Sequence, residues 1–229
     1  DRPDILGRSP LHIACHKGRE SIAKVLLDIG ADVGRRTVFG SLPLHYAAAS
    51  GSLAACKALL AVPGINANAL DNWGSTALFW AVRNKKSEIV RFLLSLDMVD
   101  PNAYNKDIEC MPPPLIEAIC QGNELVVQYF LDAGADVNNK FGRTPLICAA
   151  MDDFTQGVKF LVGRKEVDVN SRDDHGRTAL MFAAEWGCIS VVEELLKCPD
   201  THVSATDDLG QTALDLAHEK SNEAIVEAI

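Results

Sequence analysis

Histidines and paired aspartates are the residue types in this chain that could do catalytic or metal chemistry. Imidazole serves as a general base near neutral pH, and neighbouring carboxylates are oxygen ligands of the kind that calcium takes. His12 and His45 follow a leucine in two similar strings, "SPLHIAC" and "LPLHYAA". The adjacent carboxylates are Asp152 and Asp153, Asp173 and Asp174, and Asp207 and Asp208.

The spacing of these residues argues against catalysis. The chain contains no HExxH, GxSxG, P-loop or GxGxxG string, and His16, His175, His202 and His218 are scattered. The aspartate pairs are too far apart in the sequence to give good geometry around one calcium ion. Asp71, Asp173 and Asp207 instead open a tight turn, where a carboxylate accepts backbone N–H bonds. We expect no enzymatic activity, no metal and no cofactor.

The cysteines and charges restrict the class of protein further. Seven cysteines without a CxxC pair indicate reduced thiols in a cytoplasmic or nuclear protein. A regulatory thiol at Cys110 or Cys120 is the alternative to a buried or solvated one. Residues 1–100 carry 12 Lys and Arg against 9 Asp and Glu, and residues 101–229 carry 10 against 22. The acidic second half would repel DNA, so we expect no nucleic-acid partner. No apolar run reaches the ~18 residues of a membrane span, so we expect no membrane insertion.

One short string recurs along the chain and must set the positions of all these residues. It occurs as "GRSPLHIAC", "GSLPLHYAA", "GSTALFWAV", "GRTPLICAA", "GRTALMFAA" and "GQTALDLAH", with a degenerate "MPPPLIEAI". The leucines of the copies are spaced 33, 34, 37, 31, 34 and 34 residues apart: Leu11, Leu44, Leu78, Leu115, Leu146, Leu180 and Leu214. An apolar pair follows about fifteen residues after each of the first six, which predicts two helices per unit.

Local signals define where these helices begin and end. Ser9 with Pro10, and Thr144 with Pro145, predict a hydroxyl N-cap followed by a proline in the first turn. Thr76, Thr178 and Thr212 are predicted to cap in the same way. The first helices are predicted to end at glycines that can take a positive φ, which are Gly18, Gly51, Gly122 and Gly187.

These units are similar to ankyrin repeats. "SPLHIAC" and "TPLICAA" match the TPLHxAA motif, and "LLDIGADV" and "FLDAGADVN" match the end of the second helix. The resemblance covers essentially the whole chain and implies an all-α solenoid of stacked antiparallel helix pairs with β-hairpin fingers. It also implies a structural role for His12 and His45, whose rings would form hydrogen bonds that join neighbouring turns. We expect a single ankyrin domain over 1–229, with repeats at about 4–36, 37–70, 71–104, 105–138, 139–172, 173–206 and 207–229.

The two end repeats differ. The first copy has no polar cap before it, so we expect more structure upstream. The last copy mixes Asp215, Glu219 and Lys220 with apolar residues, as a C-terminal cap does.

The resemblance implies partner binding along the groove formed by the fingers and the ends of the first helices. Tyr46, Trp80 and Phe182 share one helical position and are predicted to pack between repeats. Phe39, Trp73 and Trp186 are predicted as exposed anchors. The candidate partner-binding residues are Phe39, Trp73, Arg83, Tyr104, Lys106, Asp107, Ile108, Met151, Asp152, Asp174, His175, Glu185 and Trp186.

The charge asymmetry and repeat 4 refine this hypothesis. Repeats 1 to 3 are predicted to hold an acidic or polar segment and repeats 5 to 7 a basic one, unless the asymmetry serves solubility alone. Repeat 4, "YNKDIECMPPPLIEAICQG", has a finger three residues longer than its counterparts. Two explanations carry almost equal weight: the longer finger serves recognition of a partner, or it arose by neutral drift in a surface loop. There Pro113 replaces the capping threonine, at a cost of about 1 kcal/mol.

We therefore expect a monomeric, non-catalytic scaffold that binds a protein or peptide. The alternative is the regulatory or sensing segment of a larger signalling NTPase, kinase or membrane channel.

Overall fold

The computed structural model describes residues 2–105, 112–139 and 141–229, and these contain fourteen α-helices. The chain forms two compact units. Unit 1 comprises Asp1–Glu117 with Asp132–Ala135, and unit 2 comprises Ala118–Leu131 with Asp136–Ile229. That all seven repeats form a single domain stays a prediction.

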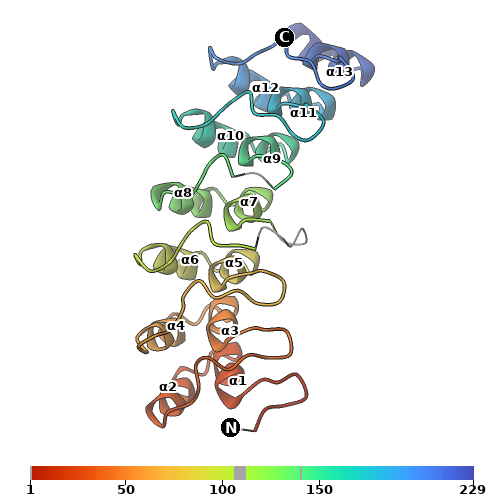
Figure 1. Ribbon diagram of the computed structural model, residues 1–229. Coiled ribbons are helices and arrows are strands. Elements are labelled where there is room, and N and C mark those ends of the chain that lie inside the picture. The colour runs from red at the N-terminus through yellow and green to blue at the C-terminus, as the bar shows by residue number, and fades with distance from the viewer. Residues whose placement is uncertain (1, 106–111, 140) are drawn as a thin grey trace. The chain divides into compact units, whose positions relative to one another are not determined.

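Unit 1 is built from three complete helix pairs and the start of a fourth. The helices are α1 (Pro10–His16), α2 (Glu20–Asp28), α3 (Pro43–Ser50), α4 (Leu53–Leu60), α5 (Ala77–Arg83), α6 (Ser87–Leu94) and the first residues of α7 (Pro114–Cys120). First helices pack on first helices, α1 on α3 and α3 on α5, and second helices α2, α4 and α6 pack in the same order. Each repeat therefore adds one helix to a column of first helices and one to a column of second helices (Figure 1).

Unit 2 repeats this arrangement. Its helices are α8 (Glu124–Asp132), α9 (Pro145–Met151), α10 (Thr155–Val162), α11 (Ala179–Trp186), α12 (Ile189–Leu196), α13 (Ala213–Glu219) and α14 (Glu223–Ala228). The first helices α9, α11 and α13 pack in sequence, as do the second helices α10, α12 and α14. The all-helical solenoid expected from the repeat is confirmed.

Hydroxyl caps start the first helices at the expected residues. The side-chain oxygens of Ser9, Thr76, Thr144, Thr178 and Thr212 each accept the backbone N–H three residues later. Such a cap satisfies one of the N–H groups that a helix start leaves without an intrahelical partner. Pro113 stands where these caps stand, and α7 begins at the next residue, Pro114.

The chain turns sharply after every first helix, seven residues beyond the repeat leucine. Glycine occupies this place in four repeats, and Gly51 and Gly187 have φ of 85° and 78°. Lys85, Asp153 and Ser221 occupy it in the other three, with φ of 57°, 52° and 57°. An L-residue in this left-handed region carries a cost of roughly 1 kcal/mol. The turn is thus required by the repeat geometry even where no glycine supplies it.

Two buried histidines join neighbouring repeats. The Nδ1 of His45 accepts the Leu42 backbone N–H at 3.0 Å, so its Nε2 carries the proton and donates to the Ser75 carbonyl at 3.1 Å. His12 bonds the Ser9 N–H and the Ser41 carbonyl in the same way. Burial lowers the pKa of both rings. Both histidines are structural, as the repeat predicted, and neither is available for catalysis.

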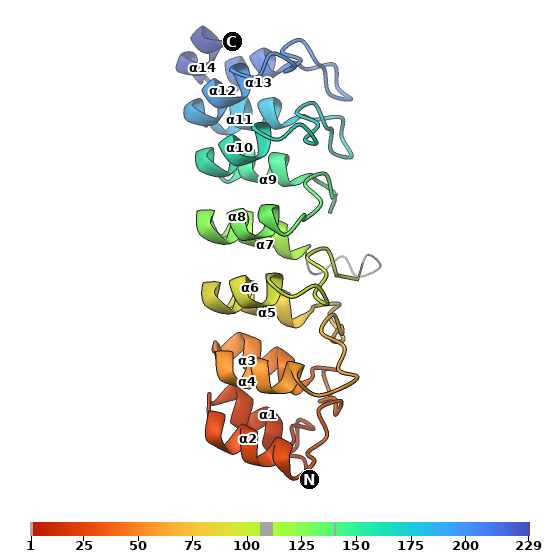
Figure 2. The same ribbon diagram turned by 90° about the vertical axis from the view of Figure 1, so that its left-hand side faces the viewer.

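The fingers are tight turns and contain no strand in the described residues. In the third finger, Asp71 N–H donates to the Ser75 carbonyl and Gly74 N–H donates back to Asp71, each at 3.0 Å. One isolated bridge, Phe141 to Arg143, closes the shortened fifth finger. Within each unit, the fingers project from the same side of the helix columns (Figure 2).

Repeat 4 is described only in part. Tyr104 is half-buried at the base of its finger. The candidate residues Lys106, Asp107 and Ile108 lie outside the described residues, so the prediction about the long finger stays open.

Candidate functional site

Two neighbouring fingers of unit 1 present a stacked aromatic pair. Phe39 and Trp73 each precede the glycine of their finger, and their ring centroids lie 5.2 Å apart with an interplanar angle of 22°. Both side chains are 38% exposed. Repetition places the two rings in register because each finger has the same turn. The pair forms an apolar, accessible surface, called here the aromatic finger pair.

The backbone beneath the aromatic finger pair is held by bonds between the two fingers. Asn72 N–H donates to the Phe39 carbonyl at 3.0 Å. Arg36 donates to the carbonyls of both Gly40 and Leu70 at 2.6 and 2.7 Å. Gly40 has φ of 72°, and a Cβ there would lie 2.9 Å from the Asn72 nitrogen. Only glycine therefore permits this approach of the two fingers.

Asp71 connects the third finger to the helix behind it. Its Oδ1 accepts the backbone N–H groups of Trp73 and Ser75 at 3.0 and 2.9 Å. Its Oδ2 accepts the indole N–H of Trp80 at 2.9 Å. One carboxylate thus shapes the turn that carries Trp73 and fixes it to α5. The expected role of the turn aspartates is confirmed at this position.

The predicted inter-repeat stripe extends behind the fingers of unit 1. Tyr46 contacts His12 on the preceding repeat and Trp80 on the following one, with centroid distances of 5.4 and 5.7 Å. Tyr46 and Trp80 are half-buried, whereas Phe182 in unit 2 is buried. Arg83 is exposed at the last residue of α5.

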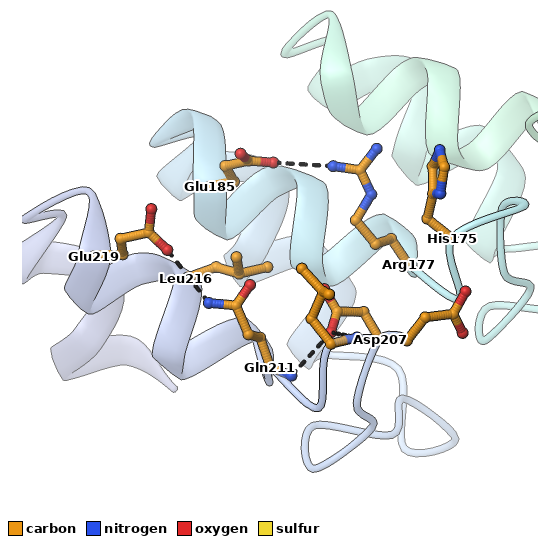
Figure 3. A pocket seen from close by; sticks show the side chains of 9 residues that line it. His175, Arg177, Glu185, Asp207, Gln211, Leu216 and Glu219 are labelled. Atoms are coloured by element: carbon orange, nitrogen blue, oxygen red, sulfur yellow. Dashed lines mark hydrogen bonds and ion pairs between the residues drawn. The ribbon is translucent and has the colours of Figure 1, made fainter.

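Unit 2 contains a hollow of about 460 Å³ between its last two fingers and the ends of α11 and α13. Figure 3 shows Arg177 reaching toward Glu185 on α11, while Gln211 reaches toward Glu219 on α13. The hollow is lined by His175, Arg177, Glu185, Asp207, Asp208, Leu209, Gln211, Leu216 and Glu219. Four of these side chains are carboxylates and one is a guanidinium.

Arg177 organises one wall of this hollow. Its guanidinium carbon lies 4.1 Å from the centroid of the Phe182 ring, a cation–π contact. Its terminal nitrogens donate to Asp173 at 3.3 Å and to Glu185 at 3.4 Å. Burial raises the pKa of Asp173, but the N–H groups of Arg177 and His175 and the charge of Arg177 outweigh it and lower the pKa overall. The remaining carboxylates leave the hollow with an excess of negative charge.

The hollow includes some of the predicted residues of unit 2 and not others. His175 and Glu185 line it. Asp174 is exposed on the same finger as His175, and Trp186 is 63% exposed at the end of α11. Met151 and Asp152, at the end of α9, are not among the lining residues.

Glu219 was missed by the sequence prediction. It occupies the helix-end position of the seventh repeat, equivalent to Glu185 in the sixth. Extending the same count from Leu214 would have found it.

The described cysteines are free thiols in different environments. Burial raises the pKa of Cys15 and of Cys56 to about 12, which makes both unreactive. Cys120 is exposed, and its hydrogen bond with Cys148 on the next first helix raises the pKa of Cys120. Cys110 lies outside the described residues.

Among the described residues, no group of three or more His, Cys, Asp or Glu side chains is placed to hold a metal ion. None of the helices in the described part of the chain is long and apolar enough to cross a membrane.

The fold and site together define a helical repeat protein. Its helix pairs stack, its first helices are capped, and its fingers are held by a turn carboxylate or hydroxyl. Comparison with known families agrees. The family model "Ankyrin repeats (3 copies)" matches residues 11–105, 115–207 and 158–229. The chain belongs to the ankyrin repeat family.

The curated relatives are much longer proteins. The chain is 33% identical over 164 residues to ankyrin repeat and SAM domain-containing protein 6 of Danio rerio, which covers 70% of this chain and 22% of that protein. It is 28% identical over 171 residues to NAD-dependent deacetylase sir2B of Dictyostelium discoideum, covering 69% and 21%. It is 28% identical over 166 residues to human Rabankyrin-5, covering 58% and 14%. The chain thus spans less than a quarter of each relative.

Two solved ankyrin repeat domains have the same fold over nearly the whole chain. The domain of human ASB11 superposes with a TM-score of 0.82 at 26% identity, covering 97% of this chain and 98% of that one. The domain of Bcl-3, described as a unique member of the IkappaB protein family, also gives 0.82 at 26% identity, covering 96% and 99%.

Proposed function

We propose that this chain is a non-catalytic scaffold that binds a protein or peptide partner along its fingers and the ends of its first helices. The aromatic finger pair is the observation that carries the proposal. Phe39 and Trp73 remain accessible although Asn72 and Arg36 join the turns that bear them. Asp71 also fixes the turn of Trp73 to α5. Rigid, exposed aromatic side chains are the usual anchors of protein interfaces.

The partner of unit 1 is an extended segment with an apolar residue and acidic or polar neighbours. The apolar residue would cover the rings of Phe39 and Trp73. Exposed Arg83 and the excess of basic residues in 1–100, 12 against 9, favour an acidic neighbour. Such charges steer the encounter more than they set the affinity.

The partner of unit 2 is a segment that carries a basic side chain. Glu185, Asp207, Asp208 and Glu219 line the hollow, against one arginine. Arg177 is already paired with Asp173 and Glu185, and Lys220 with Glu185 and Glu219, so an incoming cation would meet Asp208 first. Asp174 and Trp186 are exposed nearby in sequence and could extend this contact.

A second candidate function is that of a regulatory or sensing segment within a larger protein. The size of the curated relatives favours it, because the chain matches only 14–22% of the three compared above. One of them is described as a deacetylase. In both cases we place the chain in the cytoplasm or nucleus, in keeping with its free thiols.

Affinity capture with the isolated chain tests the proposal. The comparison variant is Phe39→Ala/Trp73→Ala, and Met98→Ala is the control because Met98 is also apolar and 47% exposed but lies outside the fingers. We expect the wild type and the control to retain the same partner proteins and the double variant to lose them. Identical retention by all three would contradict the role of the aromatic finger pair.

A further inference from the structure

Two cysteine side chains meet where the fourth and fifth repeats join. Cys120 is the last residue of α7, and Cys148 lies within α9. The Cys120 thiol donates a hydrogen bond to the Cys148 sulfur, and both residues belong to unit 2. Sulfur atoms at hydrogen-bond distance need to approach by only about 1–2 Å to reach the length of a disulfide bond. The two thiols are therefore placed to react with each other.

The repeat geometry brings these two positions together whichever residues occupy them. Cys120 follows its repeat leucine by five residues, and Cys148 follows the next repeat leucine by two. His16 and Tyr46 hold the same two positions in the first and second repeats, and their ring centroids lie 5.7 Å apart. The contact between Cys120 and Cys148 is thus a consequence of how consecutive first helices pack.

The pair is more accessible than the cysteines at the core of unit 1. Cys120 is exposed and Cys148 is half-buried, so a small oxidant can reach them from solvent. Cys15 and Cys56 are 0% exposed, and burial raises the pKa of each to about 12. Those two thiols stay protonated at neutral pH and are poor nucleophiles, since the thiolate is the form that reacts. We therefore expect oxidation at Cys120 and Cys148 before Cys15 and Cys56.

The groups around the pair give each sulfur a different role. The hydrogen bond from Cys120 and the positive charge of Arg143 lower the pKa of Cys148, and they outweigh its burial and the charge of Asp152. The pKa of Cys120 is raised, because the Cys148 sulfur holds its proton and because burial and Asp152 act in the same direction. Cys148 is therefore the nucleophilic sulfur, and Cys120 supplies the second thiol.

The position of Arg143 beside Cys148 also follows from the repeat. Arg143 precedes its repeat leucine by three residues, and Cys148 follows the same leucine by two. Arg177 and Phe182 hold these positions in the next repeat, where the guanidinium carbon lies 4.1 Å from the ring centroid. The finger thus places a cation over this position of the first helix.

We propose that Cys120 and Cys148 form a redox modification site, at which a hydroperoxide oxidises the two thiols to a disulfide that joins α7 to α9. The sequence suggested only a single regulatory thiol, at Cys110 or Cys120, and the pairing with Cys148 comes from the structure. In a compartment that keeps thiols reduced, such a disulfide is transient and is reversed by thiol–disulfide exchange. The inference does not depend on which partner the fingers bind.

With hydrogen peroxide, the oxidation takes two balanced steps. The Cys148 thiolate attacks one peroxide oxygen, so that an S–O bond forms, the O–O bond breaks and the leaving hydroxide takes up a proton to give water. Cys120 then gives up its proton, for which Asp152 is a hydrogen-bonded acceptor, and its sulfur attacks the sulfenic acid of Cys148. The S–S bond forms, the S–O bond breaks and a second water leaves. The two sulfurs are oxidised and the peroxide is reduced.

Peptide mapping of the oxidised chain tests the proposal. The reduced chain is treated with hydrogen peroxide, its remaining thiols are blocked with N-ethylmaleimide, and it is digested with trypsin without reduction. Trypsin releases residues 107–140, which contain Cys110 and Cys120, and residues 144–159, which contain Cys148. We expect these two peptides to be joined in the monomeric chain and separated by dithiothreitol. Peptides that are found apart, blocked or further oxidised, would overturn the proposal.

Cysteine variants distinguish this site from unspecific oxidation. Cys110→Ser should keep the crosslink and Cys120→Ser should lose it, and the reverse result would overturn the proposal. Cys198→Ser removes another half-buried thiol and is the matched control, which should be crosslinked as the wild type is. In urea, Cys148 should pair with Cys110 and Cys120 about equally, because the two loops have similar closure entropy. A preference for Cys120 that is as strong in urea as in water would contradict a site built by the fold.

Arg143 acts through Cys148 as a positioning residue and has its own test. Arg143→Gln should slow crosslinking by about threefold or more and raise the pH at which N-ethylmaleimide alkylates Cys148, because a nearby cation favours the thiolate. Arg143→Lys keeps the charge and should restore both the rate and the pH profile. An unchanged rate and pH profile in Arg143→Gln would contradict the role of Cys148 as the nucleophile.

Discussion

Trp73 stacks on Phe39 from the neighbouring finger, with 5.2 Å between ring centroids. Each ring sits beside a finger glycine, and the Asn72 N–H that joins the two fingers belongs to the residue before Trp73. The stack is therefore built into the backbone of both turns and does not depend on two long side chains meeting by chance. Removing either ring should change the surface offered to a partner more than it changes the fold.

Because the turn after each first helix is left-handed, introducing a glycine there and removing one should have opposite effects on the free energy of unfolding. Lys85→Gly should raise the free energy of unfolding by about 0.5–1 kcal/mol, because it relieves a positive φ that lysine rarely adopts. Gly51→Ala should lower it by about 1 kcal/mol or more for the same reason. Urea unfolding measures both. Asn84→Gly, one residue earlier at φ of −93°, is the control and should not stabilise. A destabilised Lys85→Gly variant would contradict this account.

Replacing each of the two adjacent aspartates of the sixth finger by alanine should have very different effects on the free energy of unfolding. Asp173→Ala removes the acceptor for the N–H groups of His175 and Arg177, and should cost about 1–3 kcal/mol of unfolding free energy. Asp174→Ala, at an exposed position, should cost less than about 0.5 kcal/mol. Chemical denaturation of the two variants is the measurement, and equal costs would argue against the turn role of Asp173.

The lowered pKa of Asp173 also predicts a pH dependence. A carboxyl group whose pKa is lower in the folded state stabilises the fold above its unfolded pKa of about 3.9 and loses that contribution as the pH falls through the folded value. The stability gap between the wild type and Asp173→Ala should therefore be complete at pH 6 and shrink progressively below about pH 4. A gap that grows on acidification would contradict the assignment.

His12 and His45 should remain neutral below the pH at which histidine ordinarily charges. Burial lowers the pKa of both rings, so the unfolded chain takes up protons first and the free energy of unfolding falls as the pH drops below about 6.5. NMR titration of the ring protons measures the two values directly. Charging of either ring at or above about pH 6.5 would contradict the buried, Nε2-protonated arrangement.

Much of the fold could be predicted from local sequence. The repeat leucines, the capping Ser and Thr residues and the turn glycines each act within a few residues, so their spacing predicted the helix pairs and where the helices begin. The turn role of Asp71 and Asp173 was predictable for the same reason. Leu214 is an exception among the repeat leucines, because it is only half-buried in the last helix pair.

The site was less accessible to prediction. The stacking of Phe39 on Trp73 depends on the distance between fingers, which no single repeat encodes. Nothing in the sequence singles out Arg177, and only the structure shows it stacked on Phe182 and paired with two carboxylates. Lys85, Asp153 and Ser221 were not predicted in left-handed turns, because only a few per cent of non-glycine residues adopt a positive φ.

The most direct test of the account is the dissociation constant of a captured partner for the wild type, for Trp73→Ala and for Met98→Ala. If the aromatic finger pair is the anchor, Trp73→Ala should weaken binding by roughly 30-fold, corresponding to a loss of about 2 kcal/mol. Met98→Ala should bind as the wild type does, and the unfolding midpoints of all three should confirm that each is folded. Equal affinity of Trp73→Ala and the wild type would contradict the claim that this chain holds its partner on the fingers of unit 1.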